Sequence, residues 1–163
     1  MPSLEKTLRA VNDLKASGII DESAIGGAMA LMFWIEPIPT YDLDVLVTLP
    51  QSTGPLVSLD PIYRWASERG YQAEHEHVVI EGFPVQFLPS FGALADEAIR
   101  TAADKQYQGV PLRVVRPEYL IALYLVPSAR TMKRRERAAA LRESADIDSD
   151  LLDELMRRFN LTF

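Results

Sequence analysis

The apolar residues of this chain change their spacing several times along its length. Leu4, Leu8, Val11 and Leu14 recur every three or four residues, which predicts a helix over residues 3–17. Aliphatic and β-branched runs predict strands near residues 24–25, over 41–49, as two strands within 71–88, and over 112–115. Segments bounded by proline or glycine predict further helices over 28–35, 60–69, 91–103, 117–126, 130–143 and 149–159.

This order of elements has too few strand–helix alternations for a doubly wound sheet. It predicts an α/β (α+β) fold in which a small mixed β-sheet is flanked by helices and followed by a helical C-terminal portion. The 163 residues suit a single domain. Within it we expect a core at about residues 19–126 and a helical C-terminal part at about 127–163.

Composition excludes several kinds of chemistry. The sequence contains no cysteine and only two histidines, His75 and His77. A disulfide scaffold, a thiolate metal site, a cysteine nucleophile and a three-histidine metal site within this chain are therefore excluded. The two histidines would share one face of a strand, where they either hold a metal or face solvent. Carboxylates are then the main side chains available for catalysis or metal binding.

The net charge is −6, and residues 1–90 hold most of the acidic excess. Such a protein is a poor general binder of polyanions. Residues 1–9 lack the apolar segment of a signal peptide. The longest apolar run, residues 28–35, is shorter than the roughly 20 residues that span a bilayer. We therefore expect a soluble, cytoplasmic protein without a membrane partner.

One constellation combines glycine and carboxylate residues. Gly26-Gly27 precedes the predicted helix 28–35, and Asp42 and Asp44 follow on a predicted strand. Residues i and i+2 of a strand project from the same face, about 7 Å apart, so both carboxylates can reach one or two hard cations. Glycine lets backbone N–H groups approach a phosphate closely. These parts suit the presentation of a metal–triphosphate to an attacking group.

The same residues resemble the signature of the DNA polymerase beta-like nucleotidyltransferase superfamily, in which a Gly-Gly or Gly-Ser turn, a helix and an Asp-x-Asp strand follow one another. Thr40, two residues before Asp42, resembles the AbiEii/AbiGii toxin-like branch of minimal nucleotidyltransferases. The resemblance covers roughly residues 20–140. It implies a nucleotidyltransferase-like core and Mg²⁺-dependent transfer of an NMP from an NTP to an acceptor hydroxyl.

The resemblance also implies roles for individual residues. Asp42 and Asp44 would be the catalytic and metal-binding residues. The nucleotide would be bound by Gly26, Gly27, Thr40, Gln86, Arg130 and Lys133.

Three positions depart from the superfamily pattern. Gln86 stands where a neighbouring strand usually supplies a third carboxylate, and glutamine is a poor Mg²⁺ ligand that cannot act as a base. Ile38 replaces an expected arginine, and Arg134 stands where an aspartate often follows the lysine. The acids that remain as substitutes for the missing carboxylate are Glu74, Glu76 and Glu81.

Residues 130–137 carry five positive charges and one negative charge. A helix of this kind either is a solvated surface or binds ligands. In the second case Arg130 and Lys133 would reach a triphosphate, and Arg134 and Arg135 would touch a nucleic acid.

Two functions remain open. The first is a catalytic nucleotidyltransferase whose acceptor is RNA, a protein or a small molecule. The second is a catalytically degraded module that binds a nucleotide or a protein, for instance an antitoxin-like partner in a toxin–antitoxin pair.

Overall fold

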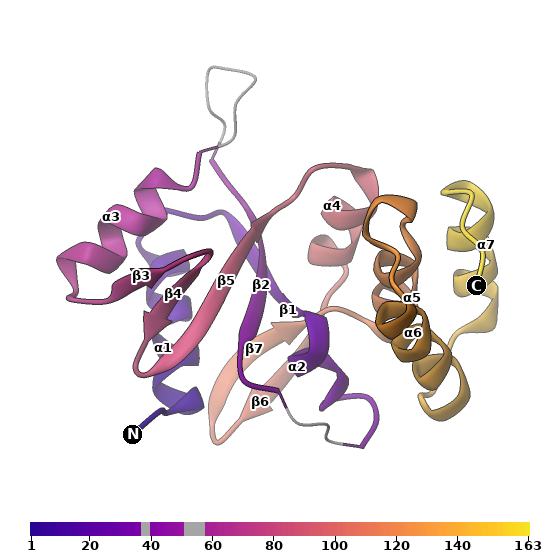
Figure 1. Cartoon of the computed structure of the whole chain (residues 1–163), viewed down its shortest axis with the longest axis horizontal. Coiled ribbons are helices and arrows are strands. Elements are labelled where there is room, and N and C mark those ends of the chain that lie inside the picture. Colours follow the sequence, from indigo (N-terminus) through magenta and orange to yellow (C-terminus); the bar gives the residue numbers. More distant parts are fainter. Residues whose placement is uncertain (37–39, 51–57) are drawn as a thin grey trace.

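A mixed β-sheet forms the centre of the molecule. The computed structural model describes residues 1–36, 40–50 and 58–163. Within these ranges the sheet has seven strands in the order β3-β4-β5-β2-β1-β7-β6 (Figure 1). The strands are β1 (Glu22–Gly26), β2 (Leu43–Thr48), β3 (Gln72–Glu74), β4 (His77–Ile80), β5 (Phe83–Pro89), β6 (Ala103–Tyr107) and β7 (Val110–Val114).

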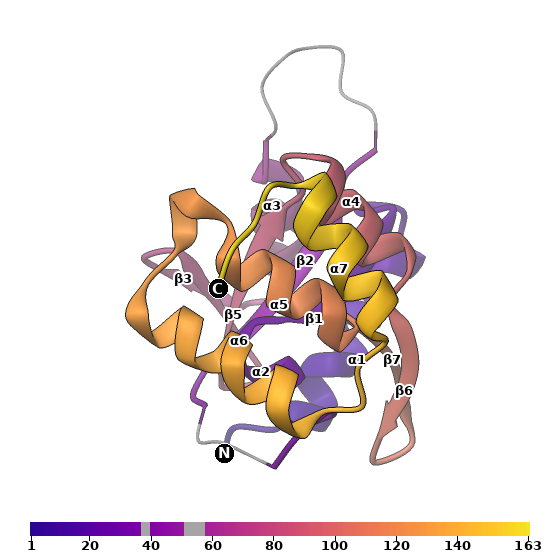
Figure 2. The same cartoon turned by 90° about the vertical axis from the view of Figure 1, so that its right-hand side faces the viewer.

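Helices cover both faces of this sheet. In the described ranges they are α1 (Leu4–Ala16), α2 (Gly27–Leu31), α3 (Asp60–Glu68), α4 (Ala93–Arg100), α5 (Pro117–Leu125), α6 (Met132–Ser144) and α7 (Ser149–Arg158), with a 3₁₀ turn η1 (Pro127–Ala129). Helices α1 and α3 lie on one side, and α4 to α7 lie on the other (Figures 1 and 2). Helix α5 packs against α4, α6 and α7, and therefore ties the C-terminal helices to the sheet.

Strand β2 occupies the middle of the sheet. It pairs antiparallel with β1 and parallel with β5. Leu43, Val45 and Val47 are fully buried on one face of β2, as expected for alternate residues of a central strand. Asp44 and Leu46 therefore point to the other face, toward α4 and α5. A central strand flanked on both sides holds a side chain at its end in a fixed position.

The structure agrees with the predicted fold class and differs from several of the predicted elements. Strands β3 and β6 are additional: each is short and forms a hairpin with its neighbour, so its existence depends on cross-strand pairing. The helix predicted over 91–103 ends at Arg100 because β6 begins at Ala103. The helix predicted over 28–35 is the short α2, followed by turns from Met32.

Asp42 precedes β2, which begins at Leu43, so only Asp44 of the pair lies within the strand. His75 lies in the turn between β3 and β4 with a φ of 56°, whereas His77 begins β4. The prediction that the two histidines share a strand face is therefore wrong. The reason is that the chain reverses direction between them, which a continuous strand would not allow. None of the helices in the described ranges is long and apolar enough to cross a membrane.

Candidate active site

Asp44 lies between Gly26 and Gln86, two residues that the sequence analysis had singled out. Its Cα pairs with that of Gly26 on β1 and with that of Gln86 on β5. Paired residues on adjacent strands share a sheet face. The structure therefore places Gln86, an amide, directly beside Asp44, at the position where the resemblance leads one to expect a third carboxylate.

Gly27 is required by its position against Asp44. Its φ is +57°, a conformation that residues with a Cβ rarely adopt. A Cβ built on Gly27 would lie 2.1 Å from Asp44 Oδ2 and 2.9 Å from its Cγ. The absent side chain thus leaves space for the Asp44 carboxylate beside the backbone that leads from β1 into α2.

Asp42 is held from two directions. The Thr40 hydroxyl lies 3.1 Å from the Asp42 main-chain oxygen and 3.4 Å from its Oδ1. His77 Nε2 lies 3.4 Å from Asp42 Oδ2, which is an ion-pair distance when the imidazole is protonated. The Asp42 side chain remains about half exposed, at 48%. It is therefore oriented by its neighbours and still accessible to a ligand.

The Asp44 carboxylate is in an unfavourable setting. Burial raises its pKa, and the nearby Asp42 raises it further, against the opposing influence of Arg134, His77 and Arg137. Within the described ranges no hydrogen bond or ion pair to this carboxylate is present. Acids with shifted pKa values are frequent at functional sites, where a bound cation can compensate the charge.

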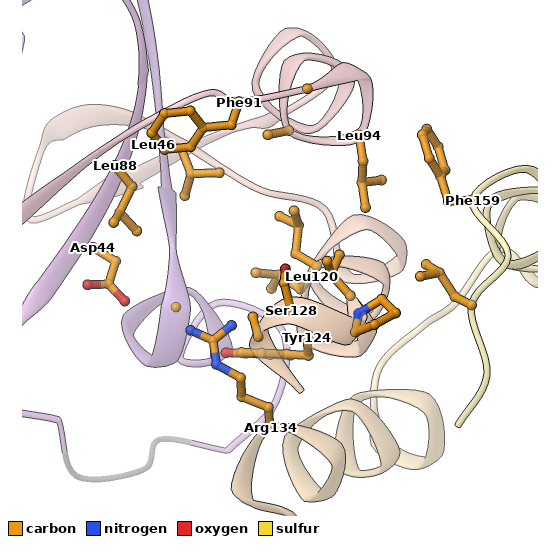
Figure 3. Close-up of a pocket in the computed structure, with 18 of the residues that line it drawn as sticks. Asp44, Leu46, Leu88, Phe91, Leu94, Leu120, Tyr124, Ser128, Arg134 and Phe159 are labelled. Carbon is orange, nitrogen blue, oxygen red and sulfur yellow. The ribbon is translucent and has the colours of Figure 1, made fainter. Parts of the chain in front are cut away.

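Two cavities meet at Asp44. The first, called the apolar cavity, has a volume of about 620 Å³ and is shown in Figure 3. Its lining comprises Gly27, Asp44, Leu46, Leu88, Pro89, Phe91, Gly92, Ala93, Leu94, Ala95, Leu120, Leu123, Tyr124, Val126, Pro127, Ser128, Ala129, Arg134, Arg137, Phe159 and Leu161.

The second, called the polar cavity, has a volume of about 560 Å³. It is lined by Ala28, Thr40, Tyr41, Asp42, Asp44, Glu74, His75, His77, Pro84, Lys133 and Arg137. Asp44 and Arg137 belong to both linings. Two compartments therefore share one carboxylate and one guanidinium.

Helix α6 supplies the positive charge at the junction, by which we mean the place where the two cavities meet at Asp44 and Arg137. Lys133 lines the polar cavity, Arg134 lines the apolar cavity, and Arg137 lines both. Arg134 also lies over the ring of Tyr124, with its Cζ 5.9 Å from the ring centroid. In Figure 3 the Arg134 guanidinium and the Tyr124 hydroxyl both lie toward the Asp44 end of the cavity. Burial raises the pKa of Tyr124, so that its hydroxyl stays protonated as a donor.

Asp42 and Asp44 suit a Mg²⁺ ion that is bound together with substrate phosphates. Mg²⁺ is commonly held by one or two carboxylates together with substrate phosphates, and Asp42 and Asp44 supply such a pair. Within the described part of the chain, no group of three or more acids, histidines or cysteines is arranged to hold a metal. The donor set therefore suits a cation that arrives with a nucleotide, and does not form a closed protein cage.

The other predicted residues lie in different places. The Arg130 guanidinium donates to the Thr162 hydroxyl at 3.3 Å and to the Phe163 carbonyl at 3.0 Å, and Arg130 lines neither of the two cavities. Its role here is to tie the C-terminal residues to the start of α6. Ile38 lies outside the described residues.

The three substitute acids are also separated. Glu74 lines the polar cavity with Asp42 and Asp44. Glu81 accepts a hydrogen bond from the Tyr71 hydroxyl at 2.9 Å, and Glu76 is exposed in the turn between β3 and β4. Of the three, Glu74 alone is placed near the aspartates.

Sequence reasoning missed the individual contributions of Arg137, Tyr124 and His77. Arg137 was visible only as part of a basic run, and Tyr124 only as one apolar position of the helix 117–126. A spacing of three between Arg134 and Arg137 puts both on one helix face, which is the one signal that could have singled them out.

The sequence matches no protein-family model, and no curated protein is significantly similar to it. Solved structures do match. The solution structure of the antibiotic-resistance factor ANT(2'')-Ia is 17% identical and has a TM-score of 0.54, over 98% of this chain and 93% of that one. The crystal structure of ANT(2'')-Ia with adenylyl-2''-tobramycin is 19% identical, with a TM-score of 0.54, over 94% and 93% of the two chains.

A third structure is an antigenic nucleotidyltransferase-like protein from Paracoccidioides brasiliensis. It is 12% identical and has a TM-score of 0.52, over 96% of this chain and 88% of that one. At these identities the likeness concerns the fold. The chain therefore has the fold of these three structures, with its Gly-Gly turn and its aspartate pair beside its C-terminal helices.

Proposed function

We propose that this protein transfers an NMP from an NTP to the hydroxyl of an acceptor, with Mg²⁺ and with release of pyrophosphate. The observation that carries the proposal is the position of Asp44, which lines two cavities at once. A group transfer needs two substrates that meet at one reacting centre, and holding them together is a large part of the rate gain. The fold likeness to ANT(2'')-Ia, whose structure holds an adenylylated aminoglycoside, supports the reaction type.

Each residue of the junction has a task in this reaction. Asp42 and Asp44 would hold the cation, whose charge would offset the negative charge of the phosphoryl group being transferred. Lys133, Arg134 and Arg137 stabilise the phosphate oxygens, since donors placed in advance around developing charge lower the barrier.

The acceptor oxygen forms a bond to the α-phosphorus of the NTP, and the bond from that phosphorus to the bridging α–β oxygen breaks. Pyrophosphate leaves with the bond electrons, and the hydroxyl proton passes to solvent through the open polar cavity. Gln86, beside Asp44, cannot take this proton because an amide is not a base at neutral pH. It can hydrogen-bond a substrate.

The test is transfer from α-labelled NTPs in the presence of Mg²⁺ and a mixture of RNA, protein and small-molecule hydroxyl acceptors. We expect a labelled acceptor with the wild-type protein, and no label with Asp44→Ala. Equal labelling by the two proteins, or none by either, would refute the transfer reaction.

A second candidate function is a module that binds a nucleotide or a partner protein without transfer, as in a toxin–antitoxin pair of the AbiEii type. The amide of Gln86 beside Asp44 favours it, because the site then lacks a third acid for metal and proton. Calorimetry with Mg²⁺ and an NTP separates the two. Binding without turnover would favour the module, and absence of nucleotide binding would leave only a partner protein. Either role is compatible with the cytoplasm, where NTPs are available.

A further inference from the structure

The apolar cavity has its charges at one end. The charged side chains among its lining residues are Asp44, Arg134 and Arg137. Asp44 and Arg134 lie at the same end of the cavity in Figure 3, and Leu94 and Phe159 lie at the opposite end. Between the two ends the described lining is formed by α4, α5, η1 and the C-terminal residues, and it is almost entirely aliphatic or aromatic.

Such a lining selects an apolar molecule. Burying apolar surface contributes roughly 25 cal/mol per Å², whereas a charge buried without a partner is strongly disfavoured. A polycationic acceptor such as an aminoglycoside would meet two arginines and a single acid in this cavity. The volume of about 620 Å³ lies in the range that holds a small molecule, and it is too small for a folded polymer.

A polar handle is present at the charged end. Tyr124 is only 4% exposed, and the Arg137 guanidinium beside it can only donate to its hydroxyl, so the hydroxyl proton has no acceptor among the described residues. Leaving a buried donor unpaired costs about 1–3 kcal/mol, so a ligand oxygen that accepts from this hydroxyl gains affinity. In Figure 3 the hydroxyl lies beside Arg134, toward Asp44. A ligand hydroxyl bound there would face the reacting centre.

The nucleotide fits the other compartment better. The polar cavity holds Lys133 and Arg137, and three acids: Glu74 and the two aspartates that would hold the cation. A triphosphate would therefore enter it together with its cation. The apolar cavity is then free for the acceptor. The two substrates would meet at Asp44, which borders both cavities.

We propose that the acceptor is a small uncharged alcohol or phenol, whose apolar body occupies the apolar cavity and whose hydroxyl is held by Tyr124 beside Asp44. This inference rests on the proposed transfer reaction for the role of the ligand as acceptor. The presence of the ligand site itself does not depend on turnover. In the transfer, the oxygen of this alcohol or phenol bonds to the α-phosphorus, pyrophosphate leaves, and the proton goes to solvent.

The first experiment measures binding without nucleotide. The probe is 2-naphthol, followed by its fluorescence, with naphthalene as the analogue that lacks the hydroxyl. We expect the wild type to bind 2-naphthol at least about fivefold more tightly than naphthalene. Tyr124→Phe should remove that preference while naphthalene binding stays unchanged. A preference that survives in Tyr124→Phe, or the absence of 2-naphthol binding, would overturn the proposal.

Two further variants address the apolar wall. Leu123→Glu places a charge in the half-buried wall, and Phe91→Asp places one at the exposed rim, where Phe91 is 82% exposed. Met132→Asp is the matched control, because Met132 is 78% exposed and lines neither of the two cavities. We expect 2-naphthol binding to weaken at least about tenfold in Leu123→Glu, about threefold in Phe91→Asp, and not at all in Met132→Asp. Unchanged Mg·ATP binding and thermal unfolding show that each variant is folded.

The second experiment measures transfer from α-labelled ATP to 2-naphthol and 1-octanol, against tobramycin and an RNA oligonucleotide. Preferential labelling of the apolar acceptors supports the inference. Preferential labelling of tobramycin or RNA would overturn it and leave the transfer reaction intact. Binding of 2-naphthol with no labelling of any acceptor would refute the transfer reaction, and with it the role of this ligand as acceptor.

Discussion

Two carboxylates on the paired strands β1 and β2 have opposite surroundings. Glu22, at the start of β1, lies 3.0 Å from Lys15 Nζ and 2.9 Å from Arg113 Nη1. Arg113 in turn donates to the carbonyl oxygens of Ile99 and Arg100. Glu22 is therefore compensated within the fold, and it joins α1, β1, α4 and β7.

Asp44 lies toward the other end of the same strand pair and has no such partner within the described residues. Burial and Asp42 raise its pKa, and the nearby arginines of α6 compensate only in part. Glu22 serves the fold, and its charge is paired within the protein. The charge of Asp44 is available for compensation by a bound cation. Four substitutions test that difference.

The largest expected effect is at Asp44. Asp44→Asn keeps the shape and removes the charge, so we expect NMP transfer to fall at least about a hundredfold, because an amide is a poor ligand for a hard cation. The free energy of unfolding should not fall, since a buried and uncompensated charge has been removed. Transfer assays and thermal unfolding on the same preparation check both statements. Transfer within tenfold of the wild type would contradict the assignment.

Gly27→Ala should act through Asp44. The new Cβ would lie within 2.1 Å of Asp44 Oδ2, so the carboxylate must move. We expect transfer to fall about tenfold or more, with a loss of about 1–2 kcal/mol of stability from the positive φ. Gly109→Ala is the matched control, because Gly109 also has a positive φ and has open space around it. It should cost similar stability and leave transfer unchanged. Equal loss of transfer in both variants would show that strain alone is responsible.

Gln86→Glu adds a third acid next to Asp44 at nearly constant volume. Without metal, we expect the variant to unfold at a lower temperature than the wild type, because a further negative charge joins an uncompensated group. Mg²⁺ should reverse that loss, and the Mg²⁺ concentration for half-maximal transfer should fall several-fold. Thermal unfolding with and without Mg²⁺ is the measurement. A variant that Mg²⁺ stabilises no more than the wild type would place residue 86 outside the metal's reach.

The smallest effect on transfer is expected at Glu22. Glu22→Gln weakens two ion pairs that are partly exposed, so we expect a loss of about 1 kcal/mol of stability, reduced at high salt. Transfer should be unchanged within twofold. Urea unfolding at low and high salt, beside the transfer assay, tests the statement. A large loss of transfer would end the distinction between the two carboxylates.

Much of the site could be predicted from the sequence because its parts are local. The Gly-Gly turn and the two aspartates are close in the chain, whereas Gln86 was singled out by the resemblance, and the structure pairs its Cα with that of Asp44. The role predicted for Arg130 finds no support in its position, since its guanidinium bonds to Thr162 and Phe163. A partner at the far end of the chain cannot be read from the charge pattern of a helix.

The sequence by itself determined which chemistry is available: carboxylates without thiols, a Gly-Gly pair before the two aspartates, and an amide at residue 86. The tertiary structure decided how these groups are distributed between the two cavities. Helix α4 packs on β1 and β2, α5 packs on α4, and α6 packs on α5. Through this chain of contacts Tyr124 and Arg137 come to line cavities that Asp44 also lines. Packing of this kind depends on contacts between segments about 80 residues or more apart, and periodicity along the chain reports only on local neighbours.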